Sequence, residues 1–393
     1  MPETPLHPSV RSFGVRLVCA LSLCAALLAL KMWQRAPQPA EPRGVWPVPV
    51  DSMPTMALVP RAGGQIPMPA NTPAAHASTL LPLPAENAAS LLAFWFAGSR
   101  ESAPDVQIAA SAFDRASRQW HPARFVVNRQ EAGAQLGFGL RRLGNPVAWR
   151  DAHGRIHLFV VATGLGGWAA GRILHLRQVD GGQDFAQLAF EPVRVLPLSW
   201  LWNTSHLVRA MPLPLADGGM VLPAYFELGK KYPVALRFDA DGEFRGMVRM
   251  SQRGYLLQPT LLMRSETDWL ALLRDNSPEK QLRAVQTVDG GQHWQDLPEP
   301  GLHNPDAAIA ALALEPGLML LAHNPRPDSR AALDLSVSSD GRQWRRLLTL
   351  AQGEGPSEYS YPSLAWADGS LWVSYTDQRR MIAWQRLDPA DKR

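Results

Sequence analysis

Short apolar runs separated by turn residues dominate the chain beyond residue 74. Leu91–Gly98 is one such run, and it leads directly into a polar loop. Runs of this length, bounded by glycine and Asp-Gly turns, are typical of β-strands. The main part of the chain, residues 74–393, is therefore predicted to be all-β.

One apolar run differs from these strands in its position and its flanks. Leu17–Leu30 follows two arginines, Arg11 and Arg16, and is closed by Lys31. A basic segment followed by an apolar one is the pattern of a secretory signal. The run is shorter than the roughly 20 apolar residues of a spanning helix. We expect residues 1–35 to be either a cleaved signal peptide or an uncleaved signal anchor.

Residues 36–73 are rich in proline, alanine and small polar residues. Such a composition favours an extended or disordered tether. The predicted organisation is thus a membrane-directed start (1–35), a Pro-rich linker (36–73) and a working domain (74–393). The signal places that domain outside the cytoplasm, in the periplasm, either free or anchored in a bacterial inner membrane.

Three segments of the working domain resemble one another. Each places an Asp-Gly turn shortly before an aromatic residue: Val179–Phe185, Val288–Trp294 and Ser339–Trp344. Glycine permits the positive φ of a tight hairpin, and the aspartate can accept hydrogen bonds from backbone N–H groups of the turn. The repeat therefore predicts a recurring hairpin.

The spacing of these turns predicts the number of repeats. A weaker copy, Ser111–Trp120, has Asp114 as its turn acid, and the Phe238–Gly242 turn lies inside the longest gap. The period is then near 50–60 residues, which fits four-stranded propeller blades. The roughly 320 residues after the linker are enough for about six blades. We predict a six-bladed β-propeller.

Composition excludes several classes of protein. The net charge of +4 is too small to indicate a nucleic-acid partner. The only cysteines, Cys19 and Cys24, lie in the membrane-directed start, so the propeller has no thiolate nucleophile and no cysteine-ligated zinc. Clustered metal ligands and phosphate-binding loops are absent from the sequence. We expect no cofactor and no metal, and a monomer.

The repeated turns resemble the Asp-boxes of bacterial neuraminidases, the BNR repeats of the sialidase superfamily. Gly144–Val147 and Trp202–His206, at predicted strand starts, resemble the sialidase-like branch of that superfamily. The resemblance implies that the Asp-boxes are structural. It also implies a site in the central funnel, where sialidases use an Asp acid/base, three arginines for the sugar carboxylate, and a Tyr nucleophile with a Glu partner.

Several segments resemble the sialidase motifs of that site. Leu91–Arg100 followed by Asp105 resembles the acid/base loop, which implies Asp105 as the acid; its alternative role is a loop cap. Arg274 matches the second carboxylate-binding arginine, and Arg326 or Arg330 matches the third. Arginine suits this role because a guanidinium binds a carboxylate with two hydrogen bonds. Each arginine has the alternative of being a solvated loop residue.

Ser357–Leu364 resembles the nucleophile segment, with Tyr361 better spaced than Tyr359. A phenol is a weak nucleophile at neutral pH unless a carboxylate removes its proton. Two aromatic residues packing a blade are the alternative for this pair.

Two positions depart from the sialidase pattern. The neighbourhood of the first arginine contains His76 and no arginine, and Gln258, which cannot act as a base, stands where the glutamate partner belongs. Glu227 is a candidate replacement from another blade. His76 is a candidate acid, base or sugar contact because imidazole titrates near neutral pH.

Three functions are compatible with these residues. The first is an exo-acting, sialidase-like glycoside hydrolase on terminal acidic sugars of extracytoplasmic glycans, with Arg100, Asn145 and Gln258 among the substrate contacts. The second is a polysaccharide lyase in which His76 and a tyrosine serve as base and acid and an arginine neutralises a uronate. The third is a catalytically silent propeller that binds a glycan or a protein.

Overall fold

The computed structural model describes residues 10–33, 41–47, 57–164, 167–179 and 184–390. The chain forms two units, Met1–Glu41 and Pro42–Arg393. The first unit contains helix α1 (Val10–Trp33). None of the helices in the described ranges is both long enough and apolar enough to cross a membrane.

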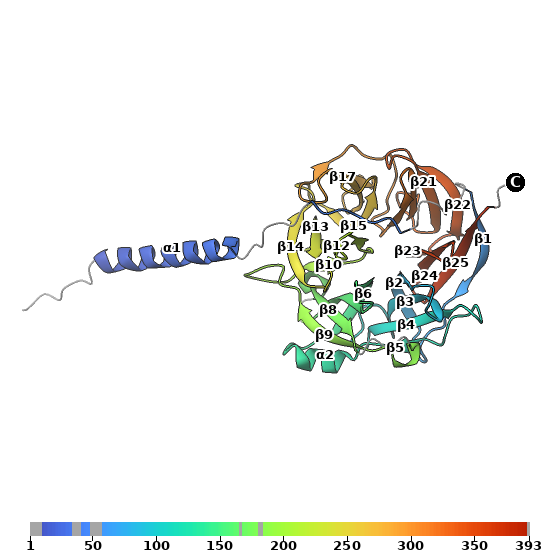
Figure 1. Cartoon of the computed structure of the whole chain (residues 1–393), viewed down its shortest axis with the longest axis horizontal. Helices are drawn as coiled ribbons and strands as arrows, with labels where there is room; N and C mark the ends of the chain where they lie inside the picture. Colours follow the sequence, from blue (N-terminus) through green and yellow to red (C-terminus); the bar gives the residue numbers. More distant parts are fainter. Residues whose placement is uncertain (1–9, 34–40, 48–56, 165–166, 180–183, 391–393) are drawn as a thin grey trace, which may run out of the picture. The chain divides into compact units, whose positions relative to one another are not determined.

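The second unit is a ring of six antiparallel sheets around a central axis (Figure 1). The strands of blades 1 to 3 are β2 (Ala74–Pro82), β3 (Ala89–Gly98), β4 (Gln107–Asp114) and β5 (Arg124–Phe125); β6 (Arg142–Arg150), β7 (Ile156–Thr163), β8 (Arg172–Gln178) and β9 (Phe190–Val195); and β10 (His206–Val208), β11 (Leu213–Pro214), β12 (Met220–Phe226), β13 (Tyr232–Phe238) and β14 (Phe244–Arg249). A short helix, α2 (Arg129–Gln135), follows β5.

The other three blades complete the ring. Their strands are β15 (Leu256–Met263), β16 (Trp269–Asp275), β17 (Arg283–Thr287) and β18 (Gln295–Asp296); β19 (Ala310–Glu315), β20 (Leu318–His323), β21 (Ala332–Ser338) and β22 (Arg345–Gln352); and β23 (Tyr359–Ala367), β24 (Ser370–Asp377), β25 (Met381–Pro389) and β1 (Leu58–Gln65). The predicted six-bladed propeller is confirmed.

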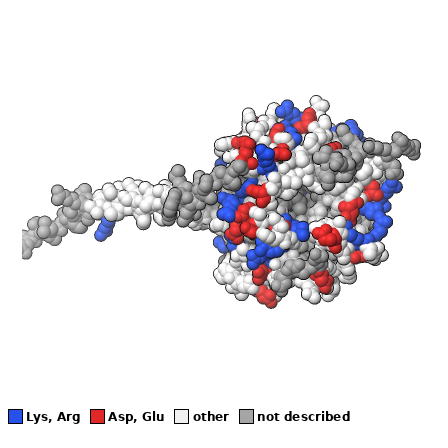
Figure 2. Space-filling view, in the orientation of Figure 1, with Lys and Arg blue, Asp and Glu red and all other residues white. Residues whose placement is uncertain are grey.

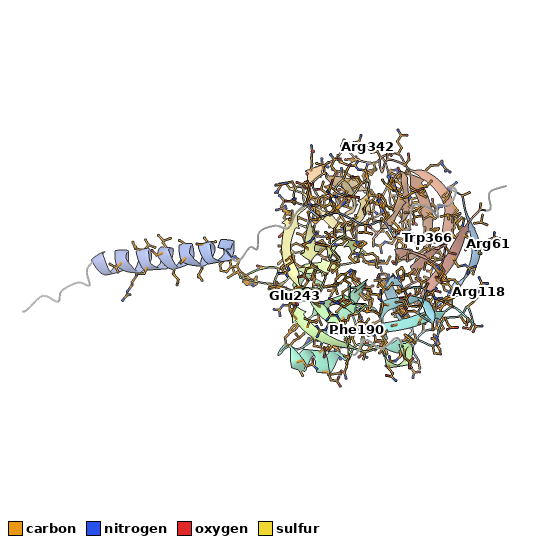
Figure 3. The ribbon with its side chains drawn as sticks, viewed as in Figure 1. Arg61, Arg118, Phe190, Glu243, Arg342 and Trp366 are labelled. Carbon is orange, nitrogen blue, oxygen red and sulfur yellow. The ribbon has the colours of Figure 1, made fainter. Side chains whose placement is uncertain are left out.

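The hydrophobic core lies between neighbouring blades, where side chains fill the space (Figure 3). Phe94 and Trp95 are adjacent in β3 and therefore point to opposite faces of the sheet. Phe94 packs against Phe190 of blade 2, at 5.8 Å between ring centroids. Trp95 belongs to the cluster that contains Trp372 and Trp384 of blade 6. Burial on both faces explains why the strands are continuous apolar runs.

The N-terminal strand closes the ring. β1 pairs with β25, so blade 6 combines strands from both ends of the propeller. β1 lies within the segment 36–73 that was expected to be a linker, and Gly44 forms a further bridge with Leu215. The propeller therefore includes residues before the expected boundary at residue 74. The β1 sequence hides this role because seven of its eight residues are exposed and show no apolar alternation.

The repeated turns join the third and fourth strands of their blades. Asp289, between β17 and β18, accepts hydrogen bonds from the N–H groups of Gln292 and His293. Asp340, between β21 and β22, accepts two such bonds in the same way. The weaker copies at Asp114 and Asp239 occupy the same position in blades 1 and 3. Part of the copy at Val179–Phe185 lies outside the described residues.

Two glycines allow a test of how much an Asp-box turn depends on packing: Gly341 lies in the Asp-box turn between β21 and β22, and Gly369 lies in the turn between β23 and β24. Gly341 and Gly369 both have a φ of +73°. A Cβ at Gly341 would overlap Leu270 Cδ2 in the neighbouring blade, whereas a Cβ at Gly369 meets nothing within 4 Å.

Both Gly→Ala variants should therefore lose about 1 kcal/mol from backbone strain. Gly341→Ala should lose a further ~1–3 kcal/mol from overpacking. Urea unfolding of the two variants measures the difference. Equal losses would contradict the packing of this turn against blade 4.

Candidate functional site

A cavity of about 130 Å³ opens at the axis, on the face where each second strand leads into its third. The Asp-box turns lie at the other ends of the strands. Eleven residues from blades 1, 2, 3, 4 and 6 line the cavity: His76, Phe96, Glu101, Asn145, Leu207, Tyr225, Glu227, Leu257, Gln258, Arg274 and Tyr361. The space-filling view in Figure 2 shows acidic and basic side chains interspersed over one face of the propeller.

Irregular backbone in the innermost strands brings several of these side chains together. The pairing of β6, β15 and β23 shifts register at Asn145, Gln258 and Tyr361, which have φ values of +41°, +46° and +54°. A proline follows each of them, and proline has no N–H to lose where the ladder is interrupted. β2 shifts in the same way at Ala77, next to His76. Such bulges redirect side chains, and here they direct three polar ones to the cavity.

Arg274 is the charged group of the cavity with the most hydrogen bonds to described residues. Its Nε donates to Asp306 Oδ1 at 2.6 Å, and its Nη1 donates to Gln258 Oε1 at 3.0 Å. Burial opposes the charge of the guanidinium, but Tyr361 and Asp306 stabilise it, so the pKa of Arg274 is raised. Arg274 is therefore a fixed cation. Its Nη2 forms no hydrogen bond with the described residues and remains able to bind an anion.

Tyr361 lies between cations and an imidazole. Arg274 Nη1 is 3.5 Å from the Tyr361 hydroxyl, and the guanidinium of Arg209 lies 5.2 Å from the ring centroid. The His76 ring is 4.1 Å away, centroid to centroid. Within the described ranges, no carboxylate lies within hydrogen-bond distance of the hydroxyl of Tyr361 or Tyr359. A base for a tyrosine nucleophile is thus missing from this arrangement.

His76 is buried and neutral. Its relative exposure is 2%, and neither ring nitrogen has a hydrogen-bond partner among the described residues. Burial, followed by the charge of Arg379, holds its pKa well below 6.5. Buried polar atoms without partners are uncommon. Because burial disfavours the charged form, the imidazole of His76 stays neutral, and both ring nitrogens remain without a hydrogen bond in the described part of the chain.

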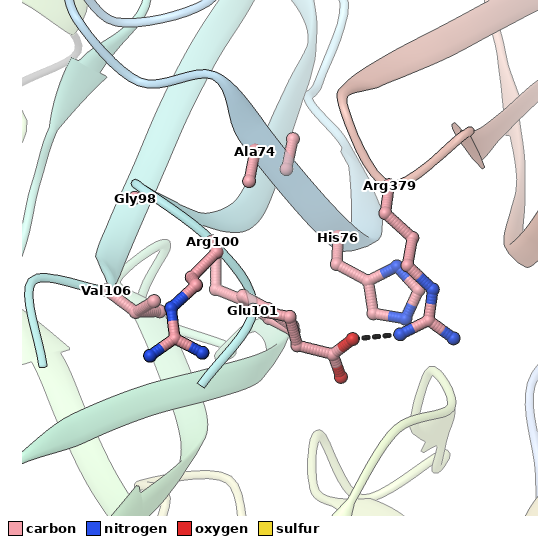
Figure 4. Close-up of a pocket in the computed structure, with 9 residues that line it drawn as sticks. Ala74, His76, Gly98, Arg100, Glu101, Val106 and Arg379 are labelled. Carbon is pink, nitrogen blue, oxygen red and sulfur yellow. Dashed lines mark hydrogen bonds and ion pairs between the residues drawn. The ribbon is translucent and has the colours of Figure 1, made fainter. Parts of the chain in front are cut away.

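Two carboxyl groups from different blades line the cavity, and they differ in their partners. Glu227 follows β12, and its carboxyl has no hydrogen bond or ion pair among the described residues; burial raises its pKa, although Lys231 and Arg274 act in the opposite direction. Glu101, in the loop after β3, forms an ion pair with Arg379 (Figure 4). The two carboxyl groups thus differ in their partners: Glu227 is unpaired among the described residues, whereas Glu101 is ion-paired.

An alternating chain of charges runs around the rim beside the cavity. Arg379 pairs with Glu358 at 2.7 Å, and Glu358 pairs with Arg330 at 3.0 Å. Burial alone would raise the pKa of Glu358, but hydrogen bonds from Arg379 and Ser360 lower it to about 2. Arg330 also donates to the carbonyl oxygen of Asp306. The chain joins blades 1, 6, 5 and 4 at the level of the site.

The structure brings together six of the residues predicted from the sequence: His76, Asn145, Glu227, Gln258, Arg274 and Tyr361. The other five lie elsewhere. Asp105 is exposed and accepts hydrogen bonds from the N–H and hydroxyl groups of Ser99. Tyr359 packs against Tyr375, and Arg326 is exposed. Arg330 belongs to the rim chain, and Arg100 lines a smaller adjoining cavity of about 10 Å³ (Figure 4).

Sequence reasoning missed several residues of the site. Glu101 follows Arg100 directly, but the sialidase pattern directs attention to Asp105 instead. Arg209 is a lone cation in an apolar segment, which is a usable signal, and it is buried with no carboxylate partner among the described residues. Burial lowers its pKa to about 10, so it stays charged at neutral pH. Arg379, in the turn after β24, carries no comparable signal.

The described part of the chain contains no group of three or more His, Cys, Asp or Glu side chains placed to hold a metal ion. The chemical groups that the cavity itself offers are two carboxyl groups, a neutral imidazole, two phenols, two amides and an arginine with an unused N–H face.

Comparisons with known proteins give the same fold. A Hadza microbial sialidase superposes with a TM-score of 0.67 at 17% identity, covering 83% of this chain and 68% of that one. A Trypanosoma rangeli sialidase in complex with sialic acid gives 0.62 at 12% identity, covering 86% and 59%. A protein of unknown function from Dyadobacter fermentans gives 0.66 at 13%, covering 85% and 100%.

At these identities the structural likeness shows the fold alone, and this chain spans about three fifths of the length of the trypanosomal sialidase. The comparison with curated proteins gives no match. The model of the BNR repeat-like domain matches residues 89–373, which is most of the propeller. The chain therefore belongs to the BNR repeat-like family.

Proposed function

We propose that this propeller is an exo-acting glycoside hydrolase that removes a terminal acidic sugar from a glycan. The observation that supports it most is the unpaired Glu227 carboxyl, with its raised pKa, in the same cavity as the ion-paired Glu101. Glycosidases generally use one protonated and one ionised carboxyl group at the scissile bond.

An acidic sugar is supported by one cation that lines the cavity and a second that is buried beneath it. Arg274 keeps an unused N–H face, and arginine binds carboxylates in a planar, bidentate manner. Arg209 lies beneath Tyr361 without a carboxylate partner in the described ranges, so its charge adds to that of Arg274. One related fold, the trypanosomal sialidase, has been solved with sialic acid bound.

In the proposed reaction Glu227 gives its proton to the glycosidic oxygen as the carbon–oxygen bond breaks. Glu101 takes a proton from water as the water oxygen bonds to the anomeric carbon, so the protons balance. Arg274 holds the sugar carboxylate. Tyr361 is assigned to stabilising positive charge at the anomeric centre. It is not assigned as the nucleophile, because its hydroxyl has Arg274 as its neighbour and no base among the described residues.

We also propose that the reaction takes place outside the cytoplasm. Support comes from the arginines before the apolar run Leu17–Leu30.

Substitution separates the two candidate acids. Glu227→Gln should lower kcat by roughly 10²- to 10⁴-fold, since a general acid supplies about that factor. Asp105→Asn, which removes a loop cap outside the cavity, should cost far less. Release of the aglycone from aryl sialosides and aryl uronosides measures both. A large loss in Asp105→Asn with little loss in Glu227→Gln would contradict the assignment.

The pH profile gives an independent test of Glu227. The general acid must be protonated, so kcat/KM should fall as the pH rises through the raised pKa of Glu227. That limb should approach a tenfold fall for each pH unit, and it should disappear from the residual activity of Glu227→Gln. If kcat/KM of the variant still fell with rising pH over the same pH range, another group would be responsible for that fall.

One observation favours a second candidate, elimination by a polysaccharide lyase. His76 has free ring nitrogens and touches Tyr361, so the imidazole could take a proton next to a uronate while the phenol protonates the leaving oxygen. The electron pair of the broken C–H bond would form the double bond of the product.

Product analysis decides between the two reactions. Hydrolysis should release sugar with no new ultraviolet absorbance, and the release should depend on Glu227. An unsaturated product whose formation is lost in His76→Ala would contradict hydrolysis. Saturable binding without any product would identify a silent glycan-binding propeller.

A further inference from the structure

An unusual loop of exposed aromatic residues lies next to the cavity. We define the aromatic loop as Ser199–Thr204, between β9 and β10. Its Trp200, Leu201 and Trp202 side chains are 85%, 71% and 71% exposed. Large exposed apolar groups that are contiguous usually mark a binding surface.

The aromatic loop is connected to the cavity through Glu227. The Glu227 N–H donates to the carbonyl oxygen of Ser205, directly after the loop, at 2.9 Å. β10 and β12 are antiparallel, with His206 opposite Phe226, so this contact continues their ladder. Leu228, which directly follows Glu227, is itself 55% exposed. The exposed apolar groups therefore begin beside the proposed acid.

The backbone of the loop is fixed although its tryptophans are not covered. Asn203 Oδ1 accepts hydrogen bonds from the N–H groups of Leu198 and Ser199, at 2.8 and 3.2 Å, and Asn203 Nδ2 donates to Leu196 O at 2.8 Å. The Ser205 N–H donates to Gly171 O at 2.6 Å. A surface that is ordered before binding loses less entropy when a ligand arrives.

We propose that the aromatic loop is a stacking platform for neutral sugar rings adjoining the acidic terminal residue, so that the ligand is an extended glycan and not a single sugar. The proposal rests on the glycan substrate proposed above. Indole faces pack against the C–H faces of pyranose rings, which are apolar. Ser199 and Thr204 add hydroxyl groups suited to sugar hydroxyls.

A lipid surface is the less favoured occupant. Loops and helices that bind membranes usually combine aromatic residues with lysine or arginine, which attract anionic headgroups. The segment Leu198–His206 contains no lysine or arginine; the neighbouring lysines Lys230 and Lys231 follow Leu228, outside the aromatic loop. The hydrogen bond between Glu227 and Ser205 would align the rest of a glycan substrate with the proposed acid. A lipid headgroup would gain nothing from that alignment.

Binding in a non-hydrolysing background tests the platform. The parent is the full chain carrying Glu227→Gln. The probes are sialyllactose and a hexuronate-capped oligosaccharide, each compared with the methyl glycoside of its acidic sugar. Trp200→Ala and Trp202→Ala should each weaken oligosaccharide binding by roughly tenfold, about 1.4 kcal/mol, and leave methyl glycoside binding unchanged. Val288→Ala, which trims a 64% exposed side chain in an Asp-box turn, should change neither.

The outcomes separate the platform from the hydrolase. Oligosaccharides that bind no tighter than methyl glycosides, or that bind equally to the tryptophan variants, would overturn the platform even if the wild type hydrolyses aryl glycosides. Tryptophan-dependent oligosaccharide binding by a wild type that releases no sugar would support the platform and overturn the hydrolase. Tryptophan-dependent sedimentation with phosphatidylcholine–phosphatidylglycerol vesicles, without glycan binding, would overturn the platform and assign the loop to lipid.

Discussion

The site depends on interruptions in the innermost strands of the propeller. In a regular strand, successive side chains point to opposite faces of the sheet and so into the interfaces with the two neighbouring blades. In β6, β15 and β23 a residue at positive φ breaks the alternation at Asn145, Gln258 and Tyr361. In the other three blades Ala77, Ser205 and Asp306 have positive φ at or before the innermost strand. Strained backbone of this kind persists only where the surrounding structure supports it.

Most charged groups at the site are paired with a group of opposite charge. Arg274, Arg330 and Arg379 are matched by Asp306, Glu358 and Glu101, so the chain of ion pairs is internally neutral. Two groups stand apart from that balance. Arg209 is buried without a carboxylate partner in the described ranges, and Glu227 is a carboxyl with a raised pKa and no partner there. A bound acidic sugar would meet the positive charge of the first and the proton of the second.

The fold could be predicted because its signals are local. Asp-Gly turns before an aromatic residue need few neighbours to be recognised, and their spacing gives the blade count. The site was predictable where a motif coincides with strand position, as for Arg274 and Tyr361. It was not predictable where partners come from distant blades: Glu101 meets Arg379 across 278 positions of sequence. β1 was hidden because its exposed, Pro- and Gly-containing sequence resembles a linker.

The central claim is that an acidic sugar lies with its glycosidic oxygen at Glu227 and its carboxylate at Arg274. A crystal structure of the Glu227→Gln chain with an acidic oligosaccharide tests this claim most directly. The account predicts a hydrogen bond between the residue 227 amide and the glycosidic oxygen, and contact between the sugar carboxylate and Arg274 Nη2. A ligand whose glycosidic oxygen lies at Asp105 or His76, or a carboxylate bound away from Arg274, would contradict it.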